Sequence, residues 1–329
     1  MGYPKINYIG NKRKIADWIV DSMPLRKGTV LDLFAGGCSM SYAFKKAGYK
    51  VISNDVLYSG YVISKAIIEN NRTILEKNVL MREGFSERND KIRELLENKI
   101  YFSDEMEELE WLIEKSKTLD GYRKAIFLAL LRRAMIRKIP YSRMNVPWNQ
   151  IVKLRDEKYS YKKYGRKRAY HNLSFIRHIA DNIDEYNSAV FDNGQQCQSY
   201  NMDALDLAKV IKKVDIVYLD PPYPSTMNNY DSFYGIFDEI FDKRQEKHLD
   251  LTNKKTFLMN IEKVIKAFSG KTKYIILSQN TKTKPGLEEM TEMLSKYGKV
   301  KIKEKKHNYQ LTGKGNKASS RELIYIVEM

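Results

Sequence analysis

The feature that most constrains this sequence is an apolar run that ends abruptly in an acid, two prolines and a tyrosine. Residues 216–219 read IVYL, and they are followed by Asp220, Pro221, Pro222 and Tyr223. A short, continuous apolar run with β-branched members predicts a strand that is buried on both faces. Because proline fixes its own φ and donates no hydrogen bond, the backbone after Asp220 is expected to be rigid, with free carbonyl oxygens.

Such a strand end can hold a planar heterocycle that carries an exocyclic amino group, since open α/β sheets bind ligands at the carboxyl ends of their strands. Asp220 and a nearby carbonyl would accept the two N–H bonds of the amino group, while Tyr223 stacks on the ring. When both N–H groups donate hydrogen bonds in this way, the lone pair of the amino nitrogen is available to attack an electrophile. The structural alternative is an acidic turn that closes a strand, but the tyrosine and the apolar run favour the functional interpretation.

A second strand, turn and helix predict a nucleotide-type binding unit near the N-terminus. Residues 29–34 read TVLDLF, and Gly36 and Gly37 follow at the turn into a helix that runs through Lys46, where a ligand can approach the backbone. Asp55 comes about 20 residues later, the spacing at which an acid meets a ribose hydroxyl. Because Asp32 would repel a pyrophosphate, the unit favours an adenosyl compound with a cationic group over a dinucleotide. A plain tight turn with a capping acid is the alternative.

The remaining pattern completes an α/β arrangement. Helices are predicted over 14–22, 122–138 and 245–268, and strands over 50–53, 273–278 and 322–327. Asp203 ends a short loop before the strand at 216–219. If its side chain points into the cleft it could contact the adenine ring of a bound cofactor, and if not it would cap a helix.

The composition predicts a globular protein in a reducing, cytoplasmic compartment. Apolar residues make up 43% of the 329 positions, and no apolar run approaches the ~20 residues of a membrane span. The charged opening residues lack the apolar segment of a secretory signal. With two cysteines, Cys38 and Cys197, and four histidines, we expect neither a disulfide framework nor a metal site.

The excess positive charge is concentrated in one segment. Of a net charge of +17, residues 121–180 carry +14, from sixteen Lys and Arg against Asp156 and Glu157, whereas residues 61–120 carry −4, from ten basic and fourteen acidic side chains. A solvated surface usually alternates charges, so nucleic acid is the expected partner and a solvated basic loop the alternative. The candidate DNA contacts are Arg132, Arg133, Arg137, Lys138, Arg143, Asn145, Lys162, Lys163, Arg166, Lys167 and Arg168.

Together these motifs resemble the Dam-type group of DNA adenine-N6 methyltransferases, the D12 class of the α arrangement. The resemblance covers most of the chain, and its most specific motifs are DPPY at 220–223 and FAGGCS at 34–39. It implies a Rossmann-like, S-adenosylmethionine-dependent methyltransferase sheet formed by residues 1–57 and 199–329. Residues 58–198 would form a mainly helical DNA target-recognition insert.

The resemblance also implies roles for individual residues. Asp220 would touch both the cofactor and the target amino group, Tyr223 would stack on an extruded adenine, and Asn145 would lie near the DNA face. Tyr8 replaces a frequent tryptophan, and Trp148 stands where a smaller aromatic residue is more usual. The implied catalytic residues are Asp220, Pro221, Pro222 and Tyr223, and the implied cofactor-binding residues are Tyr8, Lys12, Asp32, Phe34, Gly36, Gly37, Asp55, Asp203 and Asp220.

The predicted function is methyl transfer from S-adenosylmethionine to N6 of a flipped-out adenine in duplex DNA, by a restriction-modification or orphan enzyme. Cytosine-N4 methylation uses the same geometry, although those enzymes more often carry Ser in place of the first Asp of the tetrapeptide. RNA or protein-glutamine methylation shares the sheet, with Asn commonly at this position in the latter. A catalytically silent DNA-binding subunit is the alternative from another class. We expect a monomer that binds double-stranded DNA, beside which a cognate restriction endonuclease could act separately.

Overall fold

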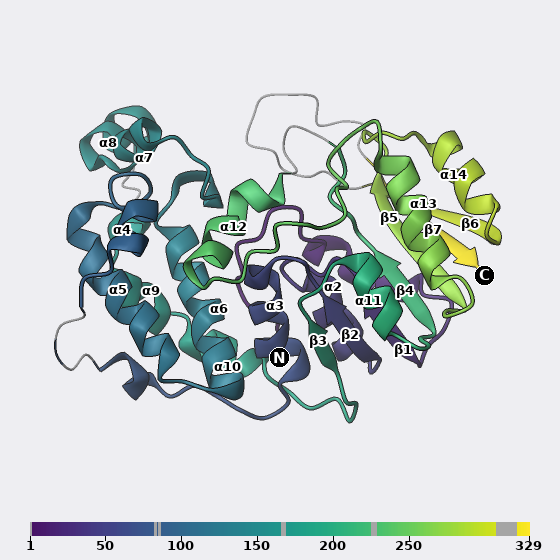
Figure 1. Ribbon diagram of the computed structural model, residues 1–329, viewed down its shortest axis with the longest axis horizontal. Coiled ribbons are helices and arrows are strands. Elements are labelled where there is room, and N and C mark those ends of the chain that lie inside the picture. Colours follow the sequence, from purple (N-terminus) through teal and green to yellow (C-terminus); the bar gives the residue numbers. More distant parts are fainter. Residues whose placement is uncertain (1, 82–83, 85–86, 166–168, 225–228, 307–320) are drawn as a thin grey trace. The chain divides into compact units, whose positions relative to one another are not determined.

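The chain folds into two compact units, one mainly helical and one α/β. The computed structural model (Figure 1) describes residues 2–81, 84, 87–165, 169–224, 229–306 and 321–329. The helical unit comprises Met1–Gly10, Leu57–Asp192 and Asp231–Arg244, and the α/β unit comprises Asn11–Val56, Asn193–Tyr230 and Gln245–Met329. The predicted fold class is confirmed.

The α/β unit is built on a seven-stranded sheet in the order β3-β2-β1-β4-β5-β7-β6. Strands β1 to β5 run parallel, whereas β7 runs antiparallel to both of its neighbours, β5 and β6. The strand order reverses between β1 and β4, which is the point where open α/β sheets bind ligands. The strands are β1 (Thr29–Asp32), β2 (Lys50–Asn54), β3 (Gln198–Tyr200), β4 (Ile216–Leu219), β5 (Tyr274–Asn280), β6 (Lys299–Lys306) and β7 (Arg321–Glu328).

Helices cover both faces of this sheet because its central strands are apolar on both sides. Every residue of β4 is buried, as the continuous apolar run predicts. On one face Val217 belongs to the same apolar cluster as Phe257 of α13, and on the other Tyr218 meets the ring of Phe44 in α2 at 5.3 Å. The helices of this unit are α1 (Ala16–Asp21), α2 (Ser39–Lys46), α11 (Ala204–Val210), α13 (Phe257–Phe268) and α14 (Leu287–Ser295).

The structure differs from the sequence-based expectation at several places in this unit, including the predicted helix over 245–268 and the unpredicted β3, β6 and α14. The predicted helix over 245–268 is wrong in its first half, because α13 begins only at Phe257. Before it, the side chains of Asp250 and Asn253 accept hydrogen bonds from Thr252 and Lys255, and these local bonds compete with helix formation. Strand β6 was not predicted because its sequence, KVKIKEKK, is largely exposed and has no apolar run. The strand lies at the edge of the sheet, where lysines discourage pairing with other chains.

The helical unit is organised around α6 (Gly121–Arg137), which contacts α3, α5, α9 and α10. The predicted helix over 122–138 is confirmed, but it is buried around most of its circumference between Ala125 and Ile136. Within the described ranges, no helix is both long and apolar enough to cross a membrane. The other helices are α3 (Tyr58–Ser64), α4 (Asp90–Leu96), α5 (Ser103–Lys117), α7 (Trp148–Arg155), α8 (Glu157–Tyr164), α9 (Phe175–Ala180), α10 (Ile183–Ala189) and α12 (Tyr230–Ile240).

This unit also draws on chain segments outside the predicted insert at 58–198. Met1–Gly10 and Asp231–Arg244, which contains nearly all of α12, belong to it as well. Asp238 connects α12 to α3. Its carboxylate accepts hydrogen bonds from the backbone N–H groups of Tyr58 and Ser59, at the start of α3, at 2.7 and 2.8 Å. A target-recognition role for this unit stays a prediction.

Candidate active site

The turn after β1 is held in shape by Asp55. The backbone N–H of Gly36 donates to Oδ2 of Asp55 at 2.6 Å, and that of Ala35 donates to the carbonyl of Asn54 at 2.9 Å. Gly36 has a φ of 52°, a conformation that glycine adopts at little cost. Gly36 and Asp55, both predicted cofactor residues, are thus in direct contact. One carboxylate oxygen of Asp55 is already hydrogen-bonded to the backbone of the loop.

Asp32 ends β1 and is 1% exposed. The hydroxyl of Ser41 donates to its Oδ2 at 2.5 Å, and the hydroxyl of Ser53 is bonded to that of Ser41. Burial raises the pKa of Asp32 to about 7; the Ser41 hydrogen bond opposes this rise, while the carboxylates of Asp220 and Asp55 add to it. A buried carboxyl group with this pKa is readily ionised by a nearby cation, as a cationic ligand would require.

Asp220 directly follows β4 and forms an ion pair with Lys12. The Nζ of Lys12 lies 2.9 Å from Oδ1 of Asp220, whose side chain keeps 20% of its surface exposed. Burial raises the pKa of Asp220 to about 6, Lys12 lowers it and Glu322 raises it further. The group is therefore largely ionised above neutral pH and can accept hydrogen bonds.

Tyr223 is fixed at both ends of its side chain. Its hydroxyl donates to the carbonyl of Ser278 at 2.6 Å, and its ring lies 5.1 Å from that of Phe257. Only 5% of the residue is exposed, so a base could stack on it only after a neighbour moves. Pro221 is buried and Pro222 half-buried, and neither belongs to a helix or strand.

Glu322 is a site residue that sequence analysis missed. It lies in β7, is fully buried, accepts the Ser278 hydroxyl at 2.7 Å and comes within 3.2 Å of the Lys12 Nζ. The only signal was an acid next to an otherwise apolar strand, LIYIV. The position of Glu322 at this edge of the sheet depends on how β5 and β7 pair. The register of that pairing could not be predicted from the sequence.

Two other predicted cofactor residues have structural roles. Asp203 caps α11: its Oδ1 accepts the N–H of Leu205 at 2.8 Å and its Oδ2 accepts that of Leu249 at 2.7 Å. The helix-cap alternative is thus the one observed, and a contact with adenine stays a prediction. Phe34 is half-buried and packs against the apolar cluster beside the sheet.

Tyr8 belongs to the helical unit, whereas the other predicted cofactor residues belong to the α/β unit. Its ring stacks on that of Tyr234 with centroids 4.7 Å apart, and the guanidinium carbon of Arg132 lies 5.3 Å from its centroid. The Tyr234 hydroxyl accepts the backbone N–H of Ile9 at 3.0 Å. These contacts hold the N-terminal segment against α6 and α12, and cofactor contact by Tyr8 stays a prediction.

Burial removes three cations from the predicted DNA-binding set. Arg132 is 1% exposed, and its Nη1 donates to the carbonyl of Ile6 at 3.2 Å. Arg133 donates from Nε to the carbonyl of Lys5 at 2.6 Å, and Lys138 is buried as well. These side chains stabilise the helical unit and cannot reach a phosphate in this structure, so the expectation for them is corrected.

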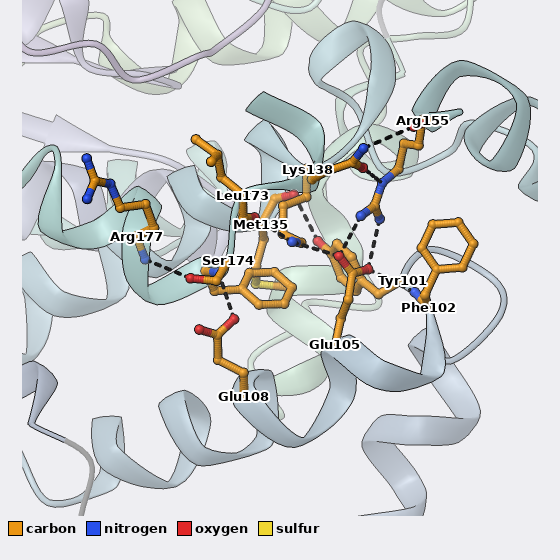
Figure 2. Close-up of polar contacts among 12 residues, drawn as sticks. Tyr101, Phe102, Glu105, Glu108, Met135, Lys138, Arg155, Leu173, Ser174 and Arg177 are labelled. Atoms are coloured by element: carbon orange, nitrogen blue, oxygen red, sulfur yellow. Dashed lines mark hydrogen bonds and ion pairs between the residues drawn. The ribbon is translucent and has the colours of Figure 1, made fainter. Parts of the chain in front are cut away.

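Lys138 takes part in a buried ion network (Figure 2). Its Nζ lies 2.7 Å from Oε1 of Glu105 and donates to the carbonyl of Leu173 at 2.6 Å, while the Arg155 guanidinium binds both oxygens of Glu105 at 2.8 and 2.5 Å. Burial opposes ionisation of Glu105, but Arg155 and Lys138 together lower its pKa. The sequence pattern could not distinguish these paired cations from exposed ones, because Glu105 lies far from them in the chain.

The other candidate DNA contacts are more accessible where the structure describes them. Lys162 and Lys163 are exposed on α8, with Tyr161 and Tyr164 exposed beside them. Asn145 is exposed and donates to the hydroxyl of Ser232 at 3.0 Å. Arg137 and Arg143 are half-buried, and Arg166, Lys167 and Arg168 lie outside the described residues.

The sheet order and the acid-proline-proline turn beside its switch point place the protein among the α/β methyltransferases. Within that class, the chain belongs to the D12 class of N6 adenine-specific DNA methyltransferases, whose family model matches residues 8–309. The predicted activity, methylation of adenine N6 in DNA, is thereby confirmed, and the family implies a methyl donor.

Relatives support this assignment along the whole chain. The Type II methyltransferase M2.HphI from Haemophilus parahaemolyticus is 43% identical over 99% of this chain and 98% of its own length. The Type II methyltransferase M.CviAII from Paramecium bursaria Chlorella virus 1 is 24% identical over 95% of each chain. The Type II methyltransferase M.NlaIII from Neisseria lactamica is 26% identical over 90% of each.

Proposed function

We propose that this methyltransferase uses S-adenosylmethionine to methylate an adenine that has been rotated out of duplex DNA, with the Dam-type, α-group arrangement of motifs. The observation that carries the proposal is the Lys12–Asp220 ion pair directly after β4, at the switch point of the sheet. A carboxylate followed by two prolines supplies hydrogen-bond acceptors at a rigid position, which is what an exocyclic amino group requires.

The residues around the β1 turn fit S-adenosylmethionine. The buried Asp32 carboxyl, held by Ser41, can balance a cationic ligand, and Gly36 takes the positive φ that the turn beside it requires. Asp55 braces that loop from the end of β2, where its second oxygen could meet a ribose hydroxyl. When bound, S-adenosylmethionine supplies an electrophilic methyl group, and the electron pair of the broken S–C bond stays on sulfur.

Asp220 and Tyr223 would act on the target base. The Asp220 carboxylate accepts hydrogen bonds from the N6 amino group and receives the proton that the nitrogen loses once the new N–C bond has formed. Tyr223, whose hydroxyl is fixed on Ser278, would present its aromatic face to the extruded base once a neighbouring side chain has moved. Extrusion costs a few kcal/mol, which stacking and the hydrogen bonds at Asp220 offset, and most of the rate would come from positioning.

We propose the helical unit, chiefly its 57–192 segment, which makes up most of the predicted 58–198 insert, as the target-recognition domain. Support comes from the exposed Lys162 and Lys163 on α8, whose neighbours Tyr161 and Tyr164 add aromatic contact area. Since the relatives are named Type II methyltransferases, we propose that this enzyme protects DNA in a Type II system, as a cytoplasmic monomer, with a separate endonuclease.

The test is the variant Asp220→Ala, which removes the acceptor for the amino group. We expect loss of methyl transfer from labelled S-adenosylmethionine to unmodified genomic DNA, with salt-dependent DNA binding retained. The matched control is Asp250→Ala, which changes a carboxylate of the same unit in a surface turn before α13. Turnover by Asp220→Ala comparable to that of the control would contradict the proposed mechanism.

A further inference from the structure

We propose that Glu322 is a positioning residue for methyl transfer: it shares the Lys12 ammonium with Asp220 and so keeps Asp220 able to accept the target amino group. This inference rests on the proposed function, in which Asp220 receives that group. Glu322 itself touches neither the base nor the methyl donor in the proposed arrangement.

The antiparallel direction of β7 brings Glu322 to the active edge of the sheet. Glu322 stands opposite Asn280 in the register of β5 and β7, where β5 ends. Because β7 runs against the parallel strands, its first residues lie at the same edge as the carboxyl ends of β1, β4 and β5. A glutamate near the start of this one strand can therefore meet a carboxylate that follows β4.

Two contacts of Glu322 involve its Oε1 atom. This oxygen accepts the Ser278 hydroxyl at 2.7 Å and lies 3.2 Å from the Lys12 Nζ, which in turn lies 2.9 Å from Oδ1 of Asp220. The backbone of Lys12 is also held, because its N–H donates to the Ser39 hydroxyl at 3.1 Å. One ammonium thus stands between two carboxylates in the interior of the protein.

The sharing changes what Asp220 can do. A carboxylate whose charge is balanced by one lysine alone attracts a further hydrogen-bond donor less strongly, because the positive charge of the ammonium opposes the approach of that donor. With Glu322 beside it, the same ammonium is shared between two side chains, and Asp220 keeps acceptor strength for the amino group. Ser278 links this arrangement to the aromatic side, since its hydroxyl binds Glu322 and its carbonyl accepts the Tyr223 hydroxyl.

Of the other titratable groups around Asp220, the tyrosines stay neutral in the pH range of the experiment, whereas Asp32 titrates within it. On β1 the nearby group is Asp32, and on or after β4 they are Tyr218 and Tyr223. Tyr325 on β7 acts on Tyr223, and burial raises the pKa of all three tyrosines, so they stay neutral between pH 5 and 9. Asp32 titrates in this range and the Asp220 carboxylate raises its pKa, so the test reads the plateau kcat beside the acidic limb.

The experiment compares the wild type with Glu322→Gln, which keeps the shape of the side chain and removes its charge. Methyl transfer from labelled S-adenosylmethionine to unmodified genomic DNA would be measured from pH 5 to 9. Removing a nearby negative charge lowers the pKa of Asp220. The acidic limb of the pH–rate profile should therefore move to lower pH by about one unit. The plateau kcat should fall about tenfold because the acceptor is weaker, with KM for S-adenosylmethionine changed less than about twofold.

Two further variants make the outcome decisive. Glu328→Gln, at the exposed opposite end of β7, should match the wild type. Glu322→Asp retains a carboxylate farther from Lys12, so its limb and kcat should fall between those of the wild type and Glu322→Gln. If Glu322→Gln does not fold, Glu322→Asp decides, and a wild-type profile for it would overturn the inference.

Failure of this inference is distinguishable from failure of the proposed function. An active wild type whose limb and kcat are reproduced by Glu322→Gln would overturn the role of Glu322 alone. A wild type that transfers no methyl group to DNA would overturn the proposed function, and the inference would fall with it.

Discussion

At the scale of single residues, two buried carboxyl groups in the α/β unit differ in what neutralises them. Asp220 faces the ammonium of Lys12, whereas Asp32 has the Ser41 hydroxyl as its hydrogen-bond donor. Both have raised pKa values, to about 6 and about 7 respectively. Without a bound cation, Asp32 is therefore the less favourable charge to keep in the folded protein.

This difference predicts that Asp32→Asn stabilises the protein at high pH. The folded-state pKa of Asp32, about 7, exceeds the ordinary value of 3.8, so folding retains a proton that the unfolded chain releases. Stability is therefore lost as pH rises between these values. At about 1.4 kcal/mol per pKa unit, the variant should be more stable by on the order of 4 kcal/mol at pH 8 and nearly equal to the wild type at pH 4.

Urea unfolding of the protein without cofactor at both pH values checks this expectation. Asp206→Asn, an exposed aspartate of α11, is the control and should change little. Equal stabilities of the wild type and Asp32→Asn at pH 8 would show that Asp32 ionises freely in the folded state.

Sequence analysis identified those residues whose position follows from local order along the chain. Asp32 and Asp220 end or follow buried strands, and Gly36 lies in the turn after one of them, so their common edge was predictable. Glu322 was not, because it reaches the same edge through the pairing of two antiparallel strands. Arg132 was misassigned because burial depends on tertiary contacts with Ile6 and Tyr8 that local sequence does not encode.

At the scale of elements, the sequence likewise predicted the elements that a local pattern marks and missed those that carry none. Strand β4 was predicted at 216–219, strand β1 over 29–34 and helix α6 over 122–138, because an apolar run or period marks each of them. Strand β6 and the segment before α13 were not, since edge lysines and short polar side chains carry no such pattern.

The buried ion network of Glu105 on α5, Lys138 directly after α6 and Arg155 on α7 predicts a stability effect. Glu105→Gln leaves Lys138 and Arg155 buried without their shared carboxylate, which should cost about 3–5 kcal/mol in the free energy of unfolding. Denaturant unfolding would measure it, with the exposed Glu114→Gln of the same helix as control. A loss below 1 kcal/mol, as for an exposed pair, would contradict the structural role assigned to this network.

Helix α8 predicts a DNA-binding effect. Replacing Lys162 and Lys163 with alanine should weaken DNA binding equally for all sequences and reduce the slope of log affinity against log salt by about 2, since each phosphate contact contributes about 0.9. Fluorescence anisotropy with duplex DNA at several salt concentrations measures both quantities. The matched control, Lys254 and Lys255 to alanine, removes the same charge from an exposed turn of the α/β unit. Equal slopes for the two double variants would argue against α8 as a DNA contact.

At the scale of the whole molecule, residues from distant parts of the chain build each unit. The active edge combines Lys12, the β1 turn, the segment after β4 and the start of β7. The helical unit likewise takes in the N-terminal segment and α12, although both lie outside the predicted insert. The topology of the sheet and the packing of the helical core therefore bring together, each within its own unit, motifs that lie far apart in the sequence.

The measurement that tests this account most directly uses the purified protein, unmodified genomic DNA and labelled S-adenosylmethionine. After the reaction, digested nucleosides are separated and the sequence around each modified base is read. The account predicts label in N6-methyladenine at one short motif. Label in N4-methylcytosine would contradict the assigned substrate, and no label despite salt-sensitive DNA binding would indicate a silent binding subunit instead of an enzyme.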